Sequence, residues 1–221
     1  MTNHVVETNL LRLKKEIVPY TPRIIAVTKY YDVNAIIDAY RAGLRDFGES
    51  RANDAIAKIE SLPEEIRKES FFHFIGHLQT NKVAKVVKYF DYIQSVDSLH
   101  LAKAISESAV KLEKTQKVFL QVNIAEESQK FGFDENELKN CIDELKNLDG
   151  IKLDGLMCMA TFGADDAELD RIFSKARELR EELNTRYGLN LTELSMGMSD
   201  DYDRAVRNGA TMIRIGRLLF N

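Results

Sequence analysis

The chain has 221 residues, of which 44% are hydrophobic and 30% are charged, enough to bury one sizeable core. Its 31 basic and 35 acidic residues give a net charge of -4 without long blocks of either sign, so neither nucleic acid nor a membrane surface is an expected partner. No apolar run approaches the roughly 20 residues of a transmembrane helix. The N-terminus also lacks a signal-peptide pattern, so we expect a cytoplasmic protein.

Apolar residues at helical and strand spacings predict an alternation of helices and strands along the chain. A first helix carries Val6, Leu10, Leu13 and Ile17 on one stripe, and Pro19 ends it. Short apolar runs predict eight strands, at residues 24–27, 44–47, 71–76, 92–96, 118–124, 151–157, 191–194 and 212–215. Stripes of apolar residues predict helices between them, around residues 36–40, 52–59, 83–90, 101–112, 138–145, 169–183 and 205–206.

Strand and helix alternate eight times, and no shift in composition marks a second domain. The simplest account is one α/β domain over residues 1–221, a closed (β/α)8 TIM-type barrel with an extra N-terminal helix. The main alternative is a doubly wound open sheet, which usually has a glycine-rich turn after its first strand. Here Lys29, Tyr30 and Tyr31 stand at that position, so we expect the barrel.

Lys29 directly follows the first buried strand, at the end of the barrel where active sites of this fold lie. Partial desolvation at such a position favours the neutral, nucleophilic form of the amine. The alternative is a lysine that only extends into water. Cys141 and Cys158 show no metal-ligand spacing and stand at apolar positions, which favours buried, reduced thiols and gives no sign of a metal site.

The ends of the last two strands predict an anion site. Small residues, a hydroxyl and free amides at 195–199 lead into a helix that starts near Asp200, and Gly216 lets the main chain approach a ligand. Phosphate sites of barrels often use these two loops, although each alone is also explained as a helix cap or a turn. Arg214 should point into the barrel, either paired with an acidic side chain or donating to a ligand heteroatom.

An amine, an anion site and an arginine around one barrel mouth suit pyridoxal phosphate, which has an aldehyde, a phosphate and a pyridine nitrogen. Several stretches strengthen this interpretation, because together they resemble the pyridoxal phosphate homeostasis protein family. Members of that family are single-domain barrels similar to the N-terminal domain of alanine racemase. The stretches run in order through nearly the whole chain: 26–29, 47–49, 73–76 with 78–79 and 81–82, 155–157, 194–201, and 209–211 with 214–216.

The resemblance implies that Lys29 holds the cofactor as a lysine aldimine, that is, a Schiff base. It implies that Ser199 and the backbone amides of Gly216 and Arg217 bind the phosphate, and that Arg214 faces the pyridine nitrogen. It further implies a role in vitamin B6 homeostasis, in which the protein buffers the cofactor or delivers it to apo-enzymes. We expect a monomer with no catalytic residue of its own.

Three positions depart from the family pattern. Ser50 stands where the family has asparagine, and Arg217 replaces a small residue, so that its side chain would crowd the phosphate or add charge there. The chain also stops at Asn221, short of a glycine that usually follows Phe220.

Two enzymatic alternatives remain. A pyridoxal phosphate-dependent amino-acid racemase needs an acid/base on each face of the α-carbon, and the related alanine racemases take the second one from an extra domain of the partner subunit. We expect no such domain after the eighth strand, and Tyr30 or Tyr31 would have to substitute, although strand-end aromatics more often pack. The other alternative is a phosphosugar or phosphoester enzyme that uses Lys29 as a Schiff-base lysine. His73 has no acidic neighbour in the sequence and is expected to be a hydrogen-bonded core histidine.

Overall fold

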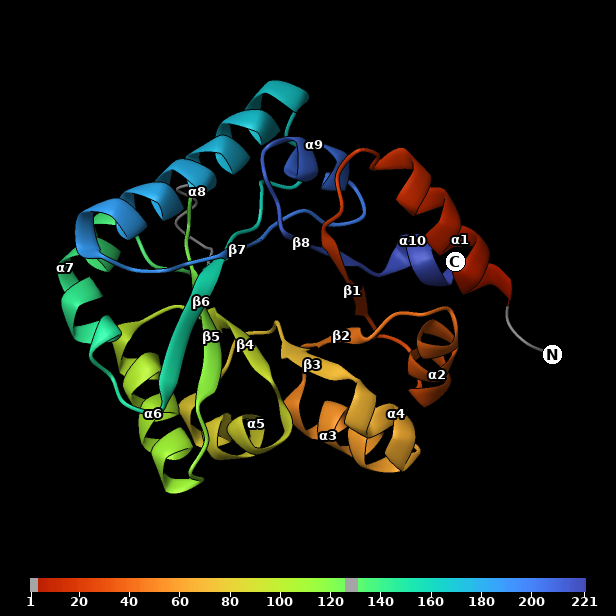
Figure 1. The fold of residues 1–221 in the computed structure, drawn as a ribbon, viewed down its shortest axis with the longest axis horizontal. Helices are drawn as coiled ribbons and strands as arrows, with labels where there is room; N and C mark the ends of the chain where they lie inside the picture. Colours follow the sequence, from red (N-terminus) through yellow and green to blue (C-terminus); the bar gives the residue numbers. More distant parts are fainter. Residues whose placement is uncertain (1–3, 126–130) are drawn as a thin grey trace.

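The computed structural model describes residues 4–125 and 131–221, and its strands form a closed barrel in the order β1 to β8 (Figure 1). Each strand pairs in parallel with the next, and β8 pairs with β1. The strands are β1 (Arg23–Val27), β2 (Asp46–Glu49), β3 (Phe71–Phe74), β4 (Tyr92–Val96), β5 (Gln116–Gln121), β6 (Ile151–Met157), β7 (Glu193–Ser195) and β8 (Met212–Ile215). This is the predicted TIM-type barrel, in which closure leaves no unpaired edge.

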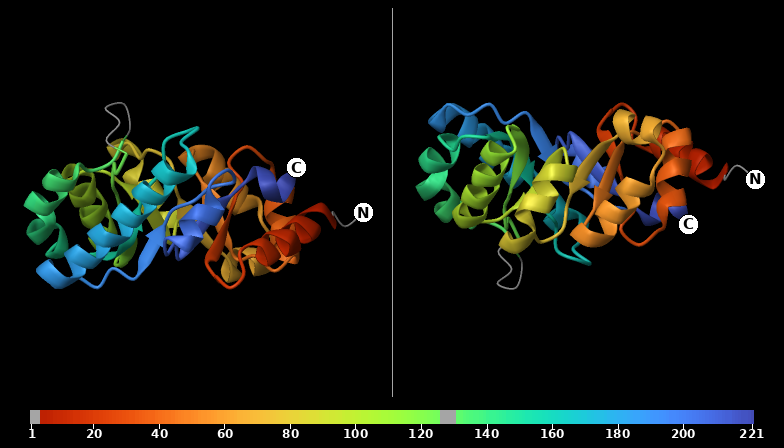
Figure 2. Two further views of the ribbon diagram at one scale, coloured as in Figure 1. Left: turned by 90° about the horizontal axis from the view of Figure 1, so that it is seen from above. Right: turned by 90° about the horizontal axis from the view of Figure 1, so that it is seen from below.

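Helices surround the barrel, as the views from above and below show (Figure 2). They are α1 (His4–Glu16), α2 (Val33–Arg41), α3 (Ala52–Ser61), α4 (Glu64–Glu69), the 3-10 turn η1 (Thr80–Lys82), α5 (Val83–Tyr89), α6 (Leu99–Lys111), α7 (Glu135–Lys146), α8 (Asp166–Tyr187), α9 (Tyr202–Arg207) and α10 (Arg217–Phe220). The first and last helices meet, because Asn9 Nδ2 donates to the carbonyls of Leu219 at 3.3 Å and Asn221 at 3.0 Å. None of these helices is both long and apolar enough to cross a bilayer within the described ranges.

Side chains that accept from free helix amides fix several helix starts. Asp32 caps α2 by accepting from the amide of Asn34. Ser98 caps α6 by accepting from the amide of Leu101. Asp165 caps α8 by accepting from the amide of Glu168. These caps explain why α2, α6 and α8 begin where they do.

Some predicted boundaries were wrong, and α4 and α10 were not predicted. The strand expected at 44–47 runs instead over Asp46–Glu49, because Gly48 and Glu49 continue the pairing with β1 and β3. The strand expected at 191–194 is β7, two residues later at its start. There the side chain of Asn184 binds both the amide (2.8 Å) and the carbonyl (3.0 Å) of Leu191, which takes this residue out of the sheet.

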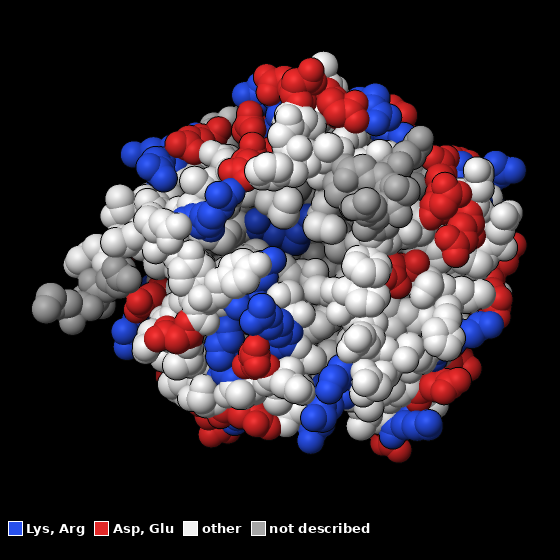
Figure 3. All heavy atoms as spheres, turned by 180° about the vertical axis from the view of Figure 1, so that it is seen from behind, with Lys and Arg blue, Asp and Glu red and all other residues white. Residues whose placement is uncertain are grey.

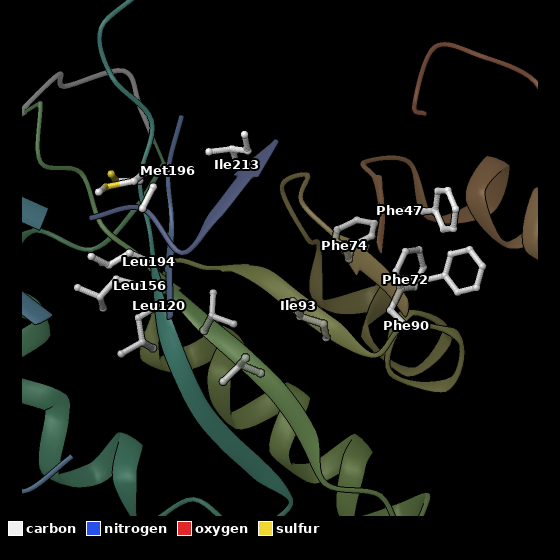
Figure 4. Packing of buried hydrophobic residues seen from close by; sticks show 14 of the residues in the cluster. Phe47, Phe72, Phe74, Phe90, Ile93, Leu120, Leu156, Leu194, Met196 and Ile213 are labelled. Carbon is white, nitrogen blue, oxygen red and sulfur yellow. The ribbon is translucent and has the colours of Figure 1, made fainter. Parts of the chain in front are cut away.

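The core has two layers. The outer layer lies between strands and helices, and Figure 4 shows part of it, including Phe74 and Phe90, whose rings meet edge to face at 5.3 Å. The inner layer fills the barrel with alternate residues of the strands. Its apolar members are Ile25, Tyr92, Phe119, Met157 and Met212. Buried polar residues share this interior, namely Asp46, His73, Gln94, Ser195 and Arg214.

Candidate functional site

A pocket of about 530 Å³ opens at the end of the barrel where the strands terminate. It brings together all five residues that the sequence assigned to cofactor binding: Lys29, Ser199, Arg214, Gly216 and Arg217. Figure 3 shows one face of the molecule, on which lysine and arginine side chains gather around a hollow near the centre. A larger surface groove of about 740 Å³, between α3, α5 and α6, contains none of the five. The smaller pocket therefore has both the volume and the polar groups of a small-molecule site.

The Lys29 side chain is half-buried in the loop after β1. Its Nζ lies 5.0 Å from the centre of the Tyr30 ring, and this ring is 76% exposed rather than packed. Tyr31 is the packing aromatic of the pair, since its ring lies 4.6 Å from that of Phe220 and its hydroxyl donates to Asn221 at 3.1 Å. Lys29 thus presents an amine to the pocket beside one exposed ring.

The main chain on both sides of Lys29 is held by an ion pair that the sequence reasoning missed. Lys58 of α3 donates to the carbonyl of Thr28 at 2.8 Å and to that of Tyr31 at 3.0 Å, and it also pairs with Glu49. The Glu49 carboxylate is buried and accepts a second bond, from the hydroxyl of Thr28 at 2.8 Å. Nothing in the sequence distinguishes Lys58 from a solvated lysine on a helix surface, because the groups it binds lie on other segments of the chain.

On the opposite side of the pocket, the loop between β7 and α9 is shaped by its main chain. Gly197 has a φ of +91°, and a Cβ there would lie 2.5 Å from the Cβ of Ala205. The buried carboxylate of Asp201 accepts from the amide of Met198, and burial raises the pKa of Asp201. These contacts fix the backbone that carries Ser199 into the pocket.

Unpaired amides line this side of the pocket. Within residues 4–125 and 131–221, the main-chain amides of Ser199, Gly216 and Arg217 donate to no other group. A Cβ on Gly216 would come within 3.3 Å of the carbonyl of Val27, so glycine leaves the main chain open here. Converging free amides and a hydroxyl form a donor set that suits a phosphate.

Arg217 follows Gly216 at the rim of the pocket. Its exposed side chain forms an ion pair with Asp200, so its charge is matched by a carboxylate while its amide remains free. Whether this side chain crowds a bound phosphate or adds charge to it stays a prediction.

Arg214 points into the barrel, as predicted, and is only 4% exposed. Its Nη1 donates to the hydroxyl of Ser195 at 2.7 Å and its Nη2 to the carbonyl of Cys158 at 2.9 Å. The expected alternative of a salt bridge is wrong for the described residues, none of which brings a carboxylate within 4.0 Å of this guanidinium. Burial lowers the pKa of Arg214. Two of its five N–H groups are used by these bonds, so the guanidinium keeps further donors beside the pocket.

His73 is a hydrogen-bonded core histidine, as expected. Its Nε2 lies 2.9 Å from Asp46 and its Nδ1 lies 2.9 Å from Gln94, and burial lowers the pKa of the ring. The sequence reasoning found no acidic neighbour because Asp46 is 27 positions away and is brought there by strand pairing.

The two cysteines are free thiols. Cys158 is buried, which raises its pKa to about 12, whereas Cys141 is only half-buried, so the expectation of two buried thiols holds for one of them. In the described part of the chain, no group of three or more histidine, cysteine or acidic side chains could hold a metal ion.

The chain is similar to known proteins along nearly its whole length. The family described as "Alanine racemase, N-terminal domain" matches residues 4–221. The chain is 41% identical over 202 residues to the pyridoxal phosphate homeostasis protein of Synechocystis sp., covering 91% of this chain and 92% of that protein. Its identity to the protein of the same name from Escherichia coli K12 is 34% over 200 residues, covering 89% and 84%.

Solved structures show the same relationship. PipY of Synechococcus elongatus PCC7942, with PLP bound, is 39% identical with a TM-score of 0.89, covering 98% of this chain and 100% of that chain. An alanine racemase from Clostridium difficile 630 has a TM-score of 0.80 at 16% identity, which shows a shared fold. The match covers 99% of this chain but 56% of the racemase chain.

Proposed function

We infer that this chain, which belongs to the pyridoxal phosphate homeostasis protein family, binds pyridoxal phosphate (PLP) and takes part in vitamin B6 homeostasis. In this role it holds the cofactor reversibly, buffers its aldehyde and delivers it to apo-enzymes. One observation carries the proposal: a half-buried amine, unpaired amides and a buried arginine face one pocket of about 530 Å³. We also propose that the protein is a monomer and that it is located in the cytoplasm.

Each part of the pocket has a proposed task. Bound PLP supplies an aldehyde that reacts with amines and a pyridine ring that withdraws electrons. Lys29 provides the amine for the aldehyde, while the Ser199 hydroxyl and the amides of Gly216 and Arg217 donate to the phosphate. Arg214 donates to the pyridine nitrogen with the N–H groups that Ser195 and Cys158 leave unused.

The position of Arg214 favours binding over catalysis. A guanidinium beside the pyridine nitrogen donates a hydrogen bond and disfavours protonation of that nitrogen, which makes the ring a weaker acceptor of electrons from a substrate. Racemisation also needs a second acid/base, and among the two tyrosines considered only Tyr30 is exposed beside Lys29. We therefore expect no exchange of the α-proton of L-alanine in deuterated water at rates typical of enzymes, and such exchange would contradict the carrier function.

An absorbance spectrum of the purified protein with added PLP tests the proposal. We expect the band of lysine-bound cofactor in the natural protein and in Lys14→Ala, a matched control on α1. The same band should be absent from Lys29→Ala. If the natural protein shows no band, PLP is not its ligand, and a phosphoester enzyme with a Schiff-base lysine becomes the better account.

A further inference from the structure

A row of buried polar side chains crosses the inside of the barrel, from the pocket to the end where the strands begin. Arg214 donates to the hydroxyl of Ser195 at 2.7 Å, and this hydroxyl donates to Oε1 of Gln94 at 2.7 Å. Nε2 of Gln94 lies 2.9 Å from Nδ1 of His73, whose Nε2 lies 2.9 Å from Asp46, the first residue of β2. None of these five residues is more than 9% exposed.

The two ends of this row fix the direction of every hydrogen bond in it. A guanidinium can only donate and a carboxylate can only accept. Neutral His73 must therefore carry its proton on Nε2, facing Asp46, and its Nδ1 must accept from the amide group of Gln94. The Gln94 oxygen then faces Ser195 and accepts from it. All donors point from Arg214 toward Asp46, so the bonds polarise one another in the same sense.

This directionality matters because no carboxylate of the described residues pairs with Arg214. Only Ser195 and the main chain of Cys158 hold its guanidinium among the described residues. The Cys158 carbonyl holds one Nη group, and Ser195 holds the other, so together they set the plane of the guanidinium. Ser195 itself is oriented by Gln94, and Gln94 by His73.

We propose that Ser195, Gln94 and His73 are positioning residues that aim the free N–H groups of Arg214 at the ring nitrogen of the cofactor. The inference rests on the proposed function, since it assigns PLP to this pocket. A structural role alone would stabilise the barrel without discriminating between ligands that differ only at the ring nitrogen. A positioning role requires such discrimination.

Two matched variants separate these roles. Ser195→Ala removes the hydroxyl that joins Arg214 to Gln94. Ser95→Ala removes an equally buried hydroxyl from the neighbour of Gln94 on β4, one that has no hydrogen-bond partner among residues 4–125 and 131–221. Both variants shorten a serine on a barrel strand, but only the first interrupts the row.

The Kd of each protein is measured for PLP and for its 1-deaza analogue, in which a C–H group replaces the ring nitrogen. We expect Ser195→Ala to weaken PLP binding roughly tenfold more than Ser95→Ala does, the effect of one charge-assisted hydrogen bond. The two variants should bind the deaza analogue with the same Kd. Should Ser195→Ala not fold, Ser195→Cys keeps the shape with a weaker donor and acceptor, and a smaller loss confined to PLP is expected.

An equal loss of affinity for both ligands in Ser195→Ala would overturn the positioning role, and so would no loss beyond that of Ser95→Ala. Failure of the natural protein to bind PLP would instead overturn the proposed function. Thermal unfolding of the ligand-free variants, measured in parallel, reports the structural contribution of the hydroxyl separately.

Discussion

The two sides of the pocket differ in what forms them: side-chain contacts on one side and the main chain on the other. On the side of Lys29, side chains hold the loop, because Lys58 and Glu49 form a buried ion pair that binds the main chain before and after the lysine. On the side of Ser199, the main chain itself forms the proposed binding surface, shaped by the left-handed backbone of Gly197. Loss of a charge should therefore reduce stability and PLP affinity most on the side of Lys29, which we call the amine side. On the side of Ser199, which we call the anion side, added atoms should have the larger effect.

Removing the charge of Lys58 should give the largest effect. Lys58→Met leaves the Glu49 carboxylate buried without its cation, and we expect the free energy of unfolding to fall by about 3–5 kcal/mol. PLP affinity should fall as well, because the loop that carries Lys29 loses two hydrogen bonds. Denaturant unfolding measures the first effect, and absorbance titration measures the second. The double variant Lys58→Met/Glu49→Gln should recover part of the stability. A loss below about 1 kcal/mol in the single variant would contradict the assigned role.

Adding one methyl group to the anion side should have the next largest effect. Gly197→Ala combines a backbone conformation that L-residues rarely adopt with a contact of 2.5 Å to Ala205, so we expect a loss of about 2–4 kcal/mol in unfolding free energy. Gly43→Ala is the matched control, since Gly43 has a φ of +95° but open space around its Cβ position. The control should lose about 1 kcal/mol and bind PLP normally. Equal losses in the two variants would show that crowding at Gly197 is unimportant.

Lowering the pH should destabilise the folded barrel, because His73 is buried in its interior. Burial holds the pKa of His73 below the value of about 6.5 that an unfolded chain has. As pH falls below that value, the unfolded chain takes up a proton that the native ring does not, so the free energy of unfolding falls. The slope approaches about 1.4 kcal/mol per pH unit for this one proton, and the contribution is constant above the unfolded pKa. Unfolding at pH 5 and pH 7.5 measures it, and a native His73 that shows its imidazole resonance titrating near 6.5 would contradict the assignment.

Removing a single donor from the anion side should have the smallest effect. Ser199→Ala deletes one hydroxyl, and we expect PLP affinity to fall about threefold to tenfold with little change in stability. Arg217→Ala is the control, because its amide is unchanged and its exposed side chain pairs with Asp200 at the rim. Affinity there should change by no more than about twofold. A larger loss in Arg217→Ala than in Ser199→Ala would reverse the roles given to the two residues.

The contrast between the two sides also explains how far the sequence could predict the structure. The barrel was predictable because each buried strand is a short apolar run. The start of β7 was not predictable, because the side chain of Asn184 on α8 binds the main chain of Leu191 and keeps that residue out of the sheet. That Lys29, Arg214 and Gly216 line one pocket was predictable because parallel strands bring their ends to the same mouth.

The residues that hold the site in place were not predictable in the same way. Lys58 has no distinctive local pattern. Ser195 and Asp201 lie in the stretch 194–201, but that pattern does not identify the groups they bind. Ser195 lies 101 positions from Gln94, and Lys58 lies 30 from Thr28. Only the folded chain reveals such pairs.

Borohydride reduction in the presence of PLP, followed by peptide mapping, identifies directly the amine that holds the cofactor. The expected result is a single stable adduct on the peptide that contains Lys29, with no adduct in Lys29→Ala. An adduct confined to another lysine, or an undiminished yield in Lys29→Ala, would contradict the assignment of Lys29 as the covalent anchor of PLP.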